Sequence, residues 1–284
     1  MHLRKLIPFL ILPALYATAP QGFIVWKASD LKAYKKAQSL ADFGNHTAQM
    51  NHREVNGQME VHQNWNDFMI VQTGEARLRI GGTVVNPKTT APGEIRGTTS
   101  LGGEEKTLGP GDIVHIPANL PHQFLVAHGQ QITYFTAKIA AKSPNSPADL
   151  KDFVLWKAQD LKAFEQSLSP KVNQNHVAGQ PLADFGNHKT QMTHREGTGE
   201  VAAHQDWVDL FEVVSGEATL LAGGTMTNAK TMSPGETRGP SIEGGEKKLV
   251  GPGDILHIPA GVPHQFLVPS GKQITYFEMK VPAK

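Results

Sequence analysis

Short runs rich in β-branched and aromatic residues alternate with glycine turns along most of the chain. Runs of this length between turn residues predict strands, and many short strands in a domain of this size predict a β-sandwich or a closed barrel. No apolar period of helical length lies between them, so the pattern predicts an all-β fold. The clearest expected strands are residues 68–73, 77–80, 112–116 and 132–139.

Two local patterns refine this prediction. Helix is expected only in short pieces, at residues 28–39 and 158–167. Asn56 and Gly57 form a pair that favours a tight hairpin turn, because both residues tolerate a positive φ angle.

The chain repeats itself, and the repeat predicts two domains. The segment that begins at Trp26 returns at Trp156, 130 positions later, and the segment that begins at Ala41 returns at Ala183, 142 positions later. The second copy therefore carries an insertion of 12 residues, expected as a surface loop within residues 167–182. Proline and small polar residues between the copies indicate a linker. The expected domains are residues 22–140 and 153–284, joined by residues 141–152.

Composition narrows the chemistry that these domains can carry. The 284 residues are enough for two cores. Lys and Arg number 27 against 26 Asp and Glu, so the chain has no overall electrostatic field that would favour nucleic-acid binding. A small-molecule ligand fits this charge balance better. The absence of cysteine excludes disulfides, thiolate metal sites and thiol nucleophiles, which leaves the 13 histidines as the main soft ligands.

The first residues differ from the rest of the chain. Basic residues precede the apolar run 6–16, and small residues follow it at positions 17–19. This order predicts a signal peptide over residues 1–19 and export to the periplasm or the cell exterior. The alternative is an uncleaved arm on a cytoplasmic protein. The apolar run is too short for a permanent membrane anchor.

Two short histidine patterns occur once in each copy. His62 is followed by Asp67 and Gly74, and the run from Pro117 ends in Pro121-His122. At these positions the sequence resembles the cupin superfamily, whose first motif has two histidines, a carboxylate and a glycine, and whose second motif is Pro-x-Gly-x-x-His. The second copy matches through His204, Asp209, Gly216 and His264.

The resemblance implies two tandem cupin barrels of the jelly-roll or double-stranded β-helix type, with one divalent metal ion in each functional barrel. His62 and His122 fall on ligand positions of the first barrel, and Asp67 falls on the carboxylate position. In the second barrel these positions are filled by His204, His264 and Asp209.

The chain departs from the cupin pattern at the first histidine. Glu60 occupies that position, and because it stands two residues from His62 on a strand its side chain can face the same way. Two imidazoles and a carboxylate suit iron, manganese or zinc. The second copy has Ala202 there. Asp67 and Asp209 are shorter than the usual Glu, so each either binds the metal ion or orients a histidine or a bound water.

His115 and His257 are candidates for acid–base catalysis. Each stands seven residues before the histidine of the second motif, on the strand that leads into it. Imidazole titrates near neutral pH, so these side chains could move protons in the pocket. The alternative is a hydrogen-bonded histidine of the barrel wall.

Two pairs of arginines leave similar alternatives. Arg53 and Arg195 stand in His-Arg-Glu triplets, which suit a surface ladder of ion pairs at least as well as substrate binding. Arg96 and Arg238 lie between the two motifs, where an arginine could clamp a carboxylate but is more often solvated.

These features favour a metal-dependent enzyme of the dioxygenase, lyase or isomerase type that acts on a small oxygenated organic molecule. The alternative is a non-catalytic cupin that binds a small molecule or a sugar. A third interpretation is that the duplication builds an interaction scaffold or a homo-oligomer. The fold hosts many reactions, so the sequence does not select one.

Overall fold

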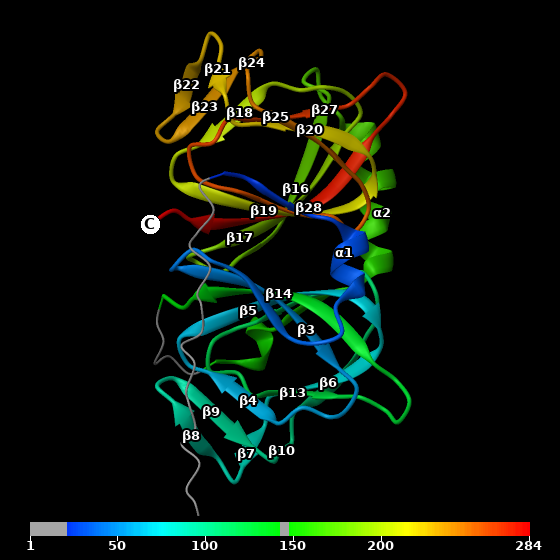
Figure 1. Cartoon of the computed structure of the whole chain (residues 1–284), viewed down its shortest axis with the longest axis vertical. Coiled ribbons are helices and arrows are strands. Elements are labelled where there is room, and N and C mark those ends of the chain that lie inside the picture. The colour runs from blue at the N-terminus through cyan, green and yellow to red at the C-terminus, as the bar shows by residue number, and fades with distance from the viewer. Residues whose placement is uncertain (1–21, 143–147) are drawn as a thin grey trace, which may run out of the picture.

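The computed structural model describes residues 22–142 and 148–284. The predicted signal peptide lies outside these residues, so export stays a prediction. In the described part of the chain no helix is both long and apolar enough to cross a bilayer. Two barrels are stacked along the long axis of the molecule, with a pair of short helices beside the junction (Figure 1).

Each barrel is made of two six-stranded antiparallel sheets. In the N-terminal barrel the sheet that faces the other barrel contains, in spatial order, β15 (Val154–Trp156), β12 (Ile113–Ile116), β5 (Trp65–Gly74), β14 (Ile132–Ala140), β3 (His46–Arg53) and β2 (Gln38–Asp42). The outer sheet contains β11 (Glu104–Leu108), β6 (Ala76–Ile80), β13 (His122–Leu125), β4 (Met59–His62), β9 (Glu94–Gly97) and β8 (Lys88–Ala91), and β7 (Thr83–Val85) pairs separately with β10 (Thr99–Leu101).

The C-terminal barrel repeats this arrangement. Its inner sheet contains β1 (Ile24–Trp26), β26 (Ile255–Ile258), β19 (Trp207–Gly216), β28 (Ile274–Pro282), β17 (Lys189–Arg195) and β16 (Val177–Asp184). Its outer sheet contains β22 (Lys230–Ser233), β23 (Glu236–Gly239), β18 (Val201–His204), β27 (His264–Leu267), β20 (Ala218–Ala222) and β25 (Glu246–Val250), and β21 (Thr225–Met226) pairs with β24 (Ile242–Glu243). The helices are α1 (Ala28–Ala33), α2 (Ala158–Leu168) and the 3-10 turns η1 (Leu150–Asp152) and η2 (Ser169–Lys171).

Three apolar cores hold the stack together, one inside each barrel and one between them. Strand β5 serves two of these cores because its side chains alternate between its faces. Met69 and Val71 enter the N-terminal barrel, whereas Phe68 and Ile70 pack between the barrels. Burial on both faces explains why this strand reads as a continuous apolar run in the sequence.

The two barrels exchange their first strands. Strand β1 belongs to the first sequence copy but pairs with β26 of the C-terminal barrel. Strand β15 belongs to the second copy but pairs with β12 of the N-terminal barrel. The barrels therefore do not coincide with the repeated sequence units.

The four expected strands are confirmed as β5, β6, β12 and β14, and the helix expected at 158–167 is α2. The helix expected at 28–39 ends at Ala33. Residues 34–37 form a loop, and β2 begins at Gln38, where pairing with β3 outweighs local helix propensity.

The hairpin predicted at Asn56 and Gly57 is wrong. Strands β3 and β4, which flank these two residues, lie in different sheets and do not form a hairpin. Instead, the N–H of Gly57 donates to the carbonyl of Phe124 in β13, and Oδ1 of Asn56 accepts from the N–H of Val126. The inserted stretch at 167–182 is also not simply a loop, since it contains the end of α2, η2 and the start of β16.

Candidate metal centres

The N-terminal barrel brings three of the predicted ligands together from two neighbouring strands. Glu60 and His62 stand two residues apart on β4, so their side chains leave the same face. His122 begins β13 and lies directly opposite Glu60 in the β13–β4 pair. One carboxylate oxygen and one nitrogen from each imidazole all lie within 4.8 Å of one another, as in a group that could hold a metal ion.

In each barrel a tight turn in the second motif is hydrogen-bonded to the backbone of the first motif. The backbone N–H of Asn119 donates to the carbonyl of His62 at 2.9 Å, and that of Gly261 donates to the carbonyl of His204 at 2.8 Å. Both turn residues have a positive φ, 68° for Asn119 and 75° for Gly261. Asparagine tolerates this conformation better than most residues. The turn is therefore kept in the first copy, although asparagine replaces the motif glycine there.

Each imidazole of the N-terminal site is oriented through its Nδ1. His62 donates from Nδ1 to Oε2 of Glu94 at 2.7 Å, and His122 donates from Nδ1 to the carbonyl of Leu120 at 3.0 Å. These bonds turn both Nε2 atoms toward the centre of the site, which is the usual way in which outer hydrogen bonds aim metal-binding histidines. The Nε2 of His122 is buried and makes no hydrogen bond.

Asp67, on β5, stands between the histidines and a lysine. Its Oδ2 lies 3.4 Å from Nε2 of His62 and 3.4 Å from Nε2 of His122. Its Oδ1 accepts a hydrogen bond from Nζ of Lys138 at 2.6 Å. The carboxylate thus presents one oxygen to the histidines while the other is held by the lysine, an arrangement compatible with either of the roles expected for Asp67.

The electrostatic field at this site favours a cation. Burial alone would lower the pKa of His62, but the charges and hydrogen bonds of Asp67, Glu60 and Glu94 outweigh it and raise that pKa to about 9. Burial opposes ionisation of Glu60, yet its contacts with both histidines and with nearby arginines lower its pKa to about 2. The same carboxylates that stabilise positive charge on His62 would stabilise a metal cation, which would displace that proton.

The C-terminal barrel gathers His204, Asp209 and His264 in the same way. Oδ2 of Asp209 lies 3.6 Å from Nε2 of His204 and 3.5 Å from Nε2 of His264. His204 donates from Nδ1 to Glu236 at 2.6 Å, and His264 donates from Nδ1 to the carbonyl of Val262 at 3.0 Å. These contacts repeat those of the first barrel.

The second site differs from the first in its carboxylates. Ala202 lies opposite His264 where Glu60 lies opposite His122, so this position offers no ligand. Burial lowers the pKa of both His204 and His264, the latter to about 4. Both imidazoles are therefore neutral at pH 7, and the neutral form is the one that binds metal ions.

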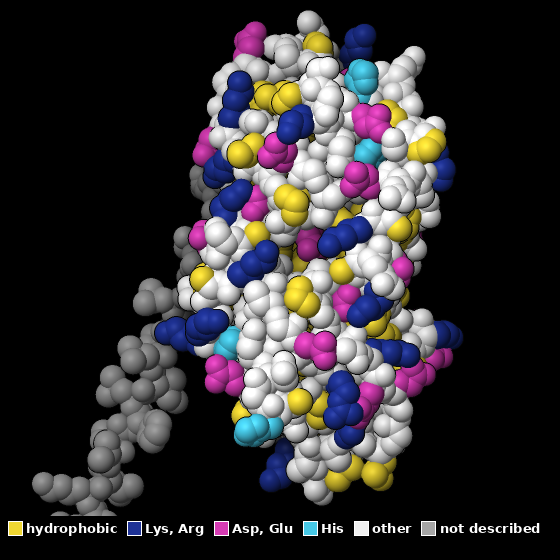
Figure 2. All heavy atoms as spheres, turned by 90° about the vertical axis from the view of Figure 1, so that its right-hand side faces the viewer, with side chains coloured by type: hydrophobic (Ala, Val, Ile, Leu, Met, Phe, Trp, Pro, Cys, Tyr) yellow, Lys and Arg dark blue, Asp and Glu magenta, His cyan; other side chains and the backbone are white. Residues whose placement is uncertain are grey.

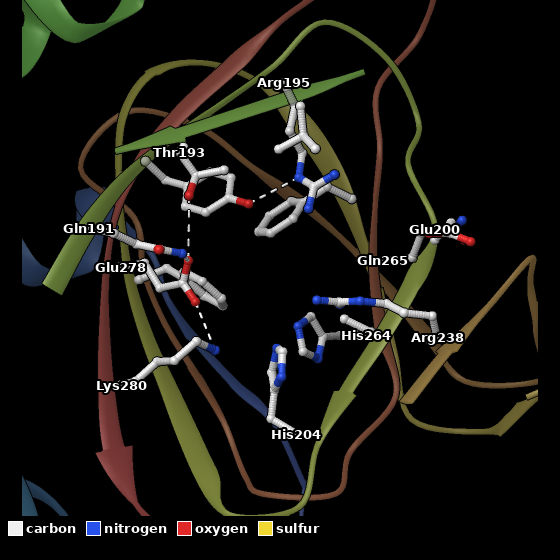
Figure 3. Close-up of a pocket in the computed structure, with 16 residues that line it drawn as sticks. Gln191, Thr193, Arg195, Glu200, His204, Arg238, His264, Gln265, Glu278 and Lys280 are labelled. Carbon is white, nitrogen blue, oxygen red and sulfur yellow. Dashed lines mark hydrogen bonds and ion pairs between the residues drawn. The ribbon is translucent and has the colours of Figure 1, made fainter. Parts of the chain in front are cut away.

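Both sites open into cavities inside the barrels. The N-terminal site lines a cavity of about 320 Å³, and the C-terminal site, drawn in Figure 3, lines one of about 210 Å³. Either volume suits a small organic molecule better than a polymer.

The sequence interpretation missed several residues that line the sites. Glu94 and Glu236 orient the first histidine of each site from a strand 32 residues away. Lys138 and its equivalent Lys280 hold the aspartates from the last strand of each barrel. Their recurrence at the same position of the last strand in both copies is the signal that could have identified them.

The structure corrects the expected placement of His115 and His257. Both lie on the outer face of their strands, in the junction between the barrels, and not in the pockets. The ring of His115 stacks on Phe185 at 3.7 Å, and the ring of His257 stacks on Phe43 at 3.9 Å. Their strands are buried on both faces, so the sequence held no sign of which face the histidines take.

Of the arginines, Arg53 and Arg96 line the N-terminal cavity, and Arg195 and Arg238 line the C-terminal one. Within the His-Arg-Glu triplets, hydrogen bonds of 3.1 Å join the histidine to the glutamate, His52 to Glu54 and His194 to Glu196. The arginine between them points into the barrel.

No protein-family model matches this chain, and no curated protein matches its sequence. Solved structures do match its fold. A salicylate 1,2-dioxygenase from Pseudaminobacter salicylatoxidans superposes with a TM-score of 0.60 at 12% identity, over 97% of this chain and 88% of the dioxygenase. The same enzyme in adducts with gentisate gives 0.58 at 14% identity, over 93% of this chain and 82% of that chain.

A cupin 2 conserved barrel domain protein from Leptotrichia buccalis superposes with a TM-score of 0.55 at 11% identity, over 93% of this chain and 99% of that protein. At such low identity the likeness establishes the fold and not the activity. Together with the two motifs in each copy, it shows that this chain has the two-barrel fold of the cupin proteins.

Proposed function

We propose that this protein is a metal-dependent enzyme that acts on a small oxygenated organic molecule, and that Glu60, His62 and His122 hold its divalent metal ion. The observation that carries the proposal is the Nε2 of His122. Because Nδ1 carries the proton, Nε2 is an acceptor, and it faces the acceptor Oδ2 of Asp67 at 3.4 Å without a hydrogen bond. A divalent cation between these two buried acceptors would satisfy both of them.

The donor set fits the metal expected from the sequence. Two imidazoles and a carboxylate suit iron, manganese or zinc and leave positions open for a substrate. When bound, such an ion polarises an oxygen of the substrate. The chain itself supplies the rest of the site: Glu94 orients His62, and the Asp67–Lys138 pair lies beside both histidines.

A second centre at His204, Asp209 and His264 is part of the proposal, with two imidazoles and one carboxylate again available. The absence of a carboxylate at Ala202 favours, for this barrel, the alternative of small-molecule binding without catalysis. The solved dioxygenase that shares the fold is named for salicylate, and its adduct holds gentisate, which supports a small oxygenated molecule as the ligand class. The face shown in Figure 2 carries interspersed acidic and basic side chains, which gives no support to nucleic-acid binding.

Elemental analysis of untagged protein tests the proposal. The wild type is expected to hold iron, manganese or zinc in near-stoichiometric amount. His122→Ala should remove the N-terminal share of that metal, because it removes one of the ligands, and His264→Ala should remove the C-terminal share. The double variant should be free of metal.

His115→Gln is the matched control, since it also replaces a buried histidine but in the junction between the barrels. It should retain the wild-type metal content, and circular dichroism should show all variants folded. Undiminished metal in the folded His122→Ala, His264→Ala double variant would rule out these centres.

A further inference from the structure

Each barrel has a half-buried arginine fixed by the same tyrosine contact. Arg53 donates from Nε to the hydroxyl of Tyr134 at 2.9 Å, and Arg195 donates from Nε to the hydroxyl of Tyr276 at 3.0 Å. A Cβ on Gly199 would lie 2.5 Å from Nη1 of Arg195, so the glycine makes room for the guanidinium. The contact fixes each guanidinium over its cavity with its Nη groups left to bind something else.

In the N-terminal barrel the arginines find internal partners. Nη2 of Arg53 lies 3.4 Å from Oε1 of Glu60, and Nη1 of Arg96 lies 3.2 Å from Oε2 of Glu94. The carboxylate of Glu60 thus takes up the charge that Arg53 brings into the cavity.

The described part of the C-terminal barrel lacks an ion pair equivalent to Arg53–Glu60. Ala202 stands where Glu60 stands, and within residues 22–142 and 148–284 no ion pair is formed by Arg195. Arg238 keeps only a long contact, 3.8 Å from Nη2 to Oε2 of Glu236. Figure 3 shows the guanidinium groups of Arg195 and Arg238 pointing from different walls into the same space above His264.

The extra carboxylate of this barrel does not replace Glu60. Glu278 stands on β28 where the first copy has Thr136, and it shares Lys280 with Asp209, at 2.9 Å and 2.5 Å respectively. Against the effect of burial, its charge helps to raise the pKa of Arg195, but the two side chains form no ion pair. Gln191 also donates to Glu278 at 2.5 Å. Glu200 lines the mouth of the pocket but is exposed, and Figure 3 shows it away from the two guanidinium groups.

Arg195 has no ion-pair partner among the described residues and Arg238 has only a distant one, so the two guanidinium groups in this half-buried cavity form a site for an anion. The planar guanidinium fork matches a carboxylate best. Phe211 and Phe266 line the same cavity of about 210 Å³ and offer apolar surface for the rest of the molecule. We infer that the C-terminal barrel binds a small organic carboxylate between Arg195 and Arg238. This deepens the proposed function, on which it rests in placing the ligand beside His204 and His264.

Calorimetric titration of the metal-loaded full chain with benzoate tests the inference, with benzamide as the neutral isostere. Benzoate is expected to bind at one site per chain, and benzamide at least about tenfold more weakly, because only the anion pairs with both arginines. Arg195→Gln and Arg238→Gln should each weaken benzoate binding by about tenfold or more. Ala202→Glu should do the same by supplying the carboxylate that the N-terminal barrel already has.

Arg53→Gln is the matched control and should leave benzoate affinity unchanged, because Glu60 already occupies that arginine. Equal binding of benzoate and benzamide would overturn the inference, as would tighter binding of inorganic phosphate than of benzoate or a loss in Arg53→Gln alone. Metal content is measured in the same samples. If benzoate affinity depends on Arg195 and Arg238 but the protein holds no metal, the proposed metal centre is refuted and the carboxylate site stands. If the protein holds its full metal content but benzoate affinity does not depend on these arginines, the carboxylate site is refuted and the metal centre stands.

Discussion

Glu212 is a carboxyl group buried between the barrels. It is 5% exposed, its Oε2 has no hydrogen-bond partner, and the first copy has Ile70 at this position. Gln72 lines the same small cavity, about 180 Å³ in volume, together with Lys32. Burial raises the pKa of Glu212 to about 8, only partly opposed by Lys32. The native protein therefore keeps this carboxyl protonated at neutral pH.

The substitution Glu212→Gln should stabilise the protein at alkaline pH. Above pH 4.5 the unfolded chain releases the proton while the native state keeps it, so the wild type loses stability as pH rises from 4.5 to about 8. Glutamine does not titrate, so the free energy of unfolding should exceed that of the wild type by about 2–4 kcal/mol at pH 8. Urea denaturation at pH 5 and pH 8 measures the gain, which should nearly vanish at pH 5. A gain independent of pH would mean that the carboxyl is ionised in the native state.

At the scale of elements, the exchanged strands tie the two barrels into one folding unit. Strand β1 covers β26 of the C-terminal barrel, and Trp26 also packs on Phe135 of the N-terminal barrel, with 5.4 Å between ring centroids. The equivalent Trp156 contacts Phe68 and Phe277 from β15. Each barrel thus depends on a strand that the other sequence copy supplies.

The substitution Trp26→Ala should loosen the C-terminal barrel, although Trp26 belongs to the first sequence copy. Loss of the half-buried indole should cost about 1–3 kcal/mol, and strand β1 should detach more often from β26. Hydrogen exchange followed by mass spectrometry should show faster exchange at β26 (Ile255–Ile258) and little change at β12 (Ile113–Ile116). In Trp156→Ala the faster exchange should appear at β12 instead of β26. Faster exchange at β12 in Trp26→Ala would show that β1 does not pair with the C-terminal barrel.

At the scale of the whole molecule, two reciprocal histidine clusters close the junction between the barrels. His46 stacks on Phe43 of its own copy and bonds through Nε2 to Nε2 of His257 at 2.9 Å. His188 lies beside His115 in the equivalent position on the other side, with 5.0 Å between ring centroids. Burial lowers the pKa of all four imidazoles, to about 4 for His46 and His115 and about 3 for His188 and His257.

These clusters should make the protein sensitive to acid. Below pH 6.5 the unfolded chain binds protons that the native junction does not, so stability falls progressively as pH drops from 6.5 to about 4. In His188→Gln the loss of unfolding free energy between pH 7 and pH 5 should be smaller than in the wild type by about 1–2 kcal/mol. Urea denaturation at both pH values measures it. The exposed His128→Gln should keep the wild-type loss, and an unchanged loss in His188→Gln would exclude the junction as the source.

Much of the fold and of the candidate metal centres could be predicted from the sequence because the information is local. Alternating strand positions place Glu60 beside His62, and the spacing of each motif puts its histidine at the start or end of a short strand. A left-handed turn needs only one tolerant residue, so Asn119 preserves the geometry that glycine provides in the second copy.

Other features depended on contacts that no local pattern records. Trp26 and Trp156 begin nearly identical segments, so nothing in either segment tells which barrel its strand will join, and the stacking of the two barrels decides it. His115 lies on a strand with both faces buried, where polarity does not mark the inner face. The sequence by itself determined the strands, the repeat and the candidate metal-binding residues, because these follow from patterns local to one strand or motif. Only the tertiary structure decided the strand exchange, the face of His115 and the unpaired charge of Arg195, because each depends on residues far apart in the chain.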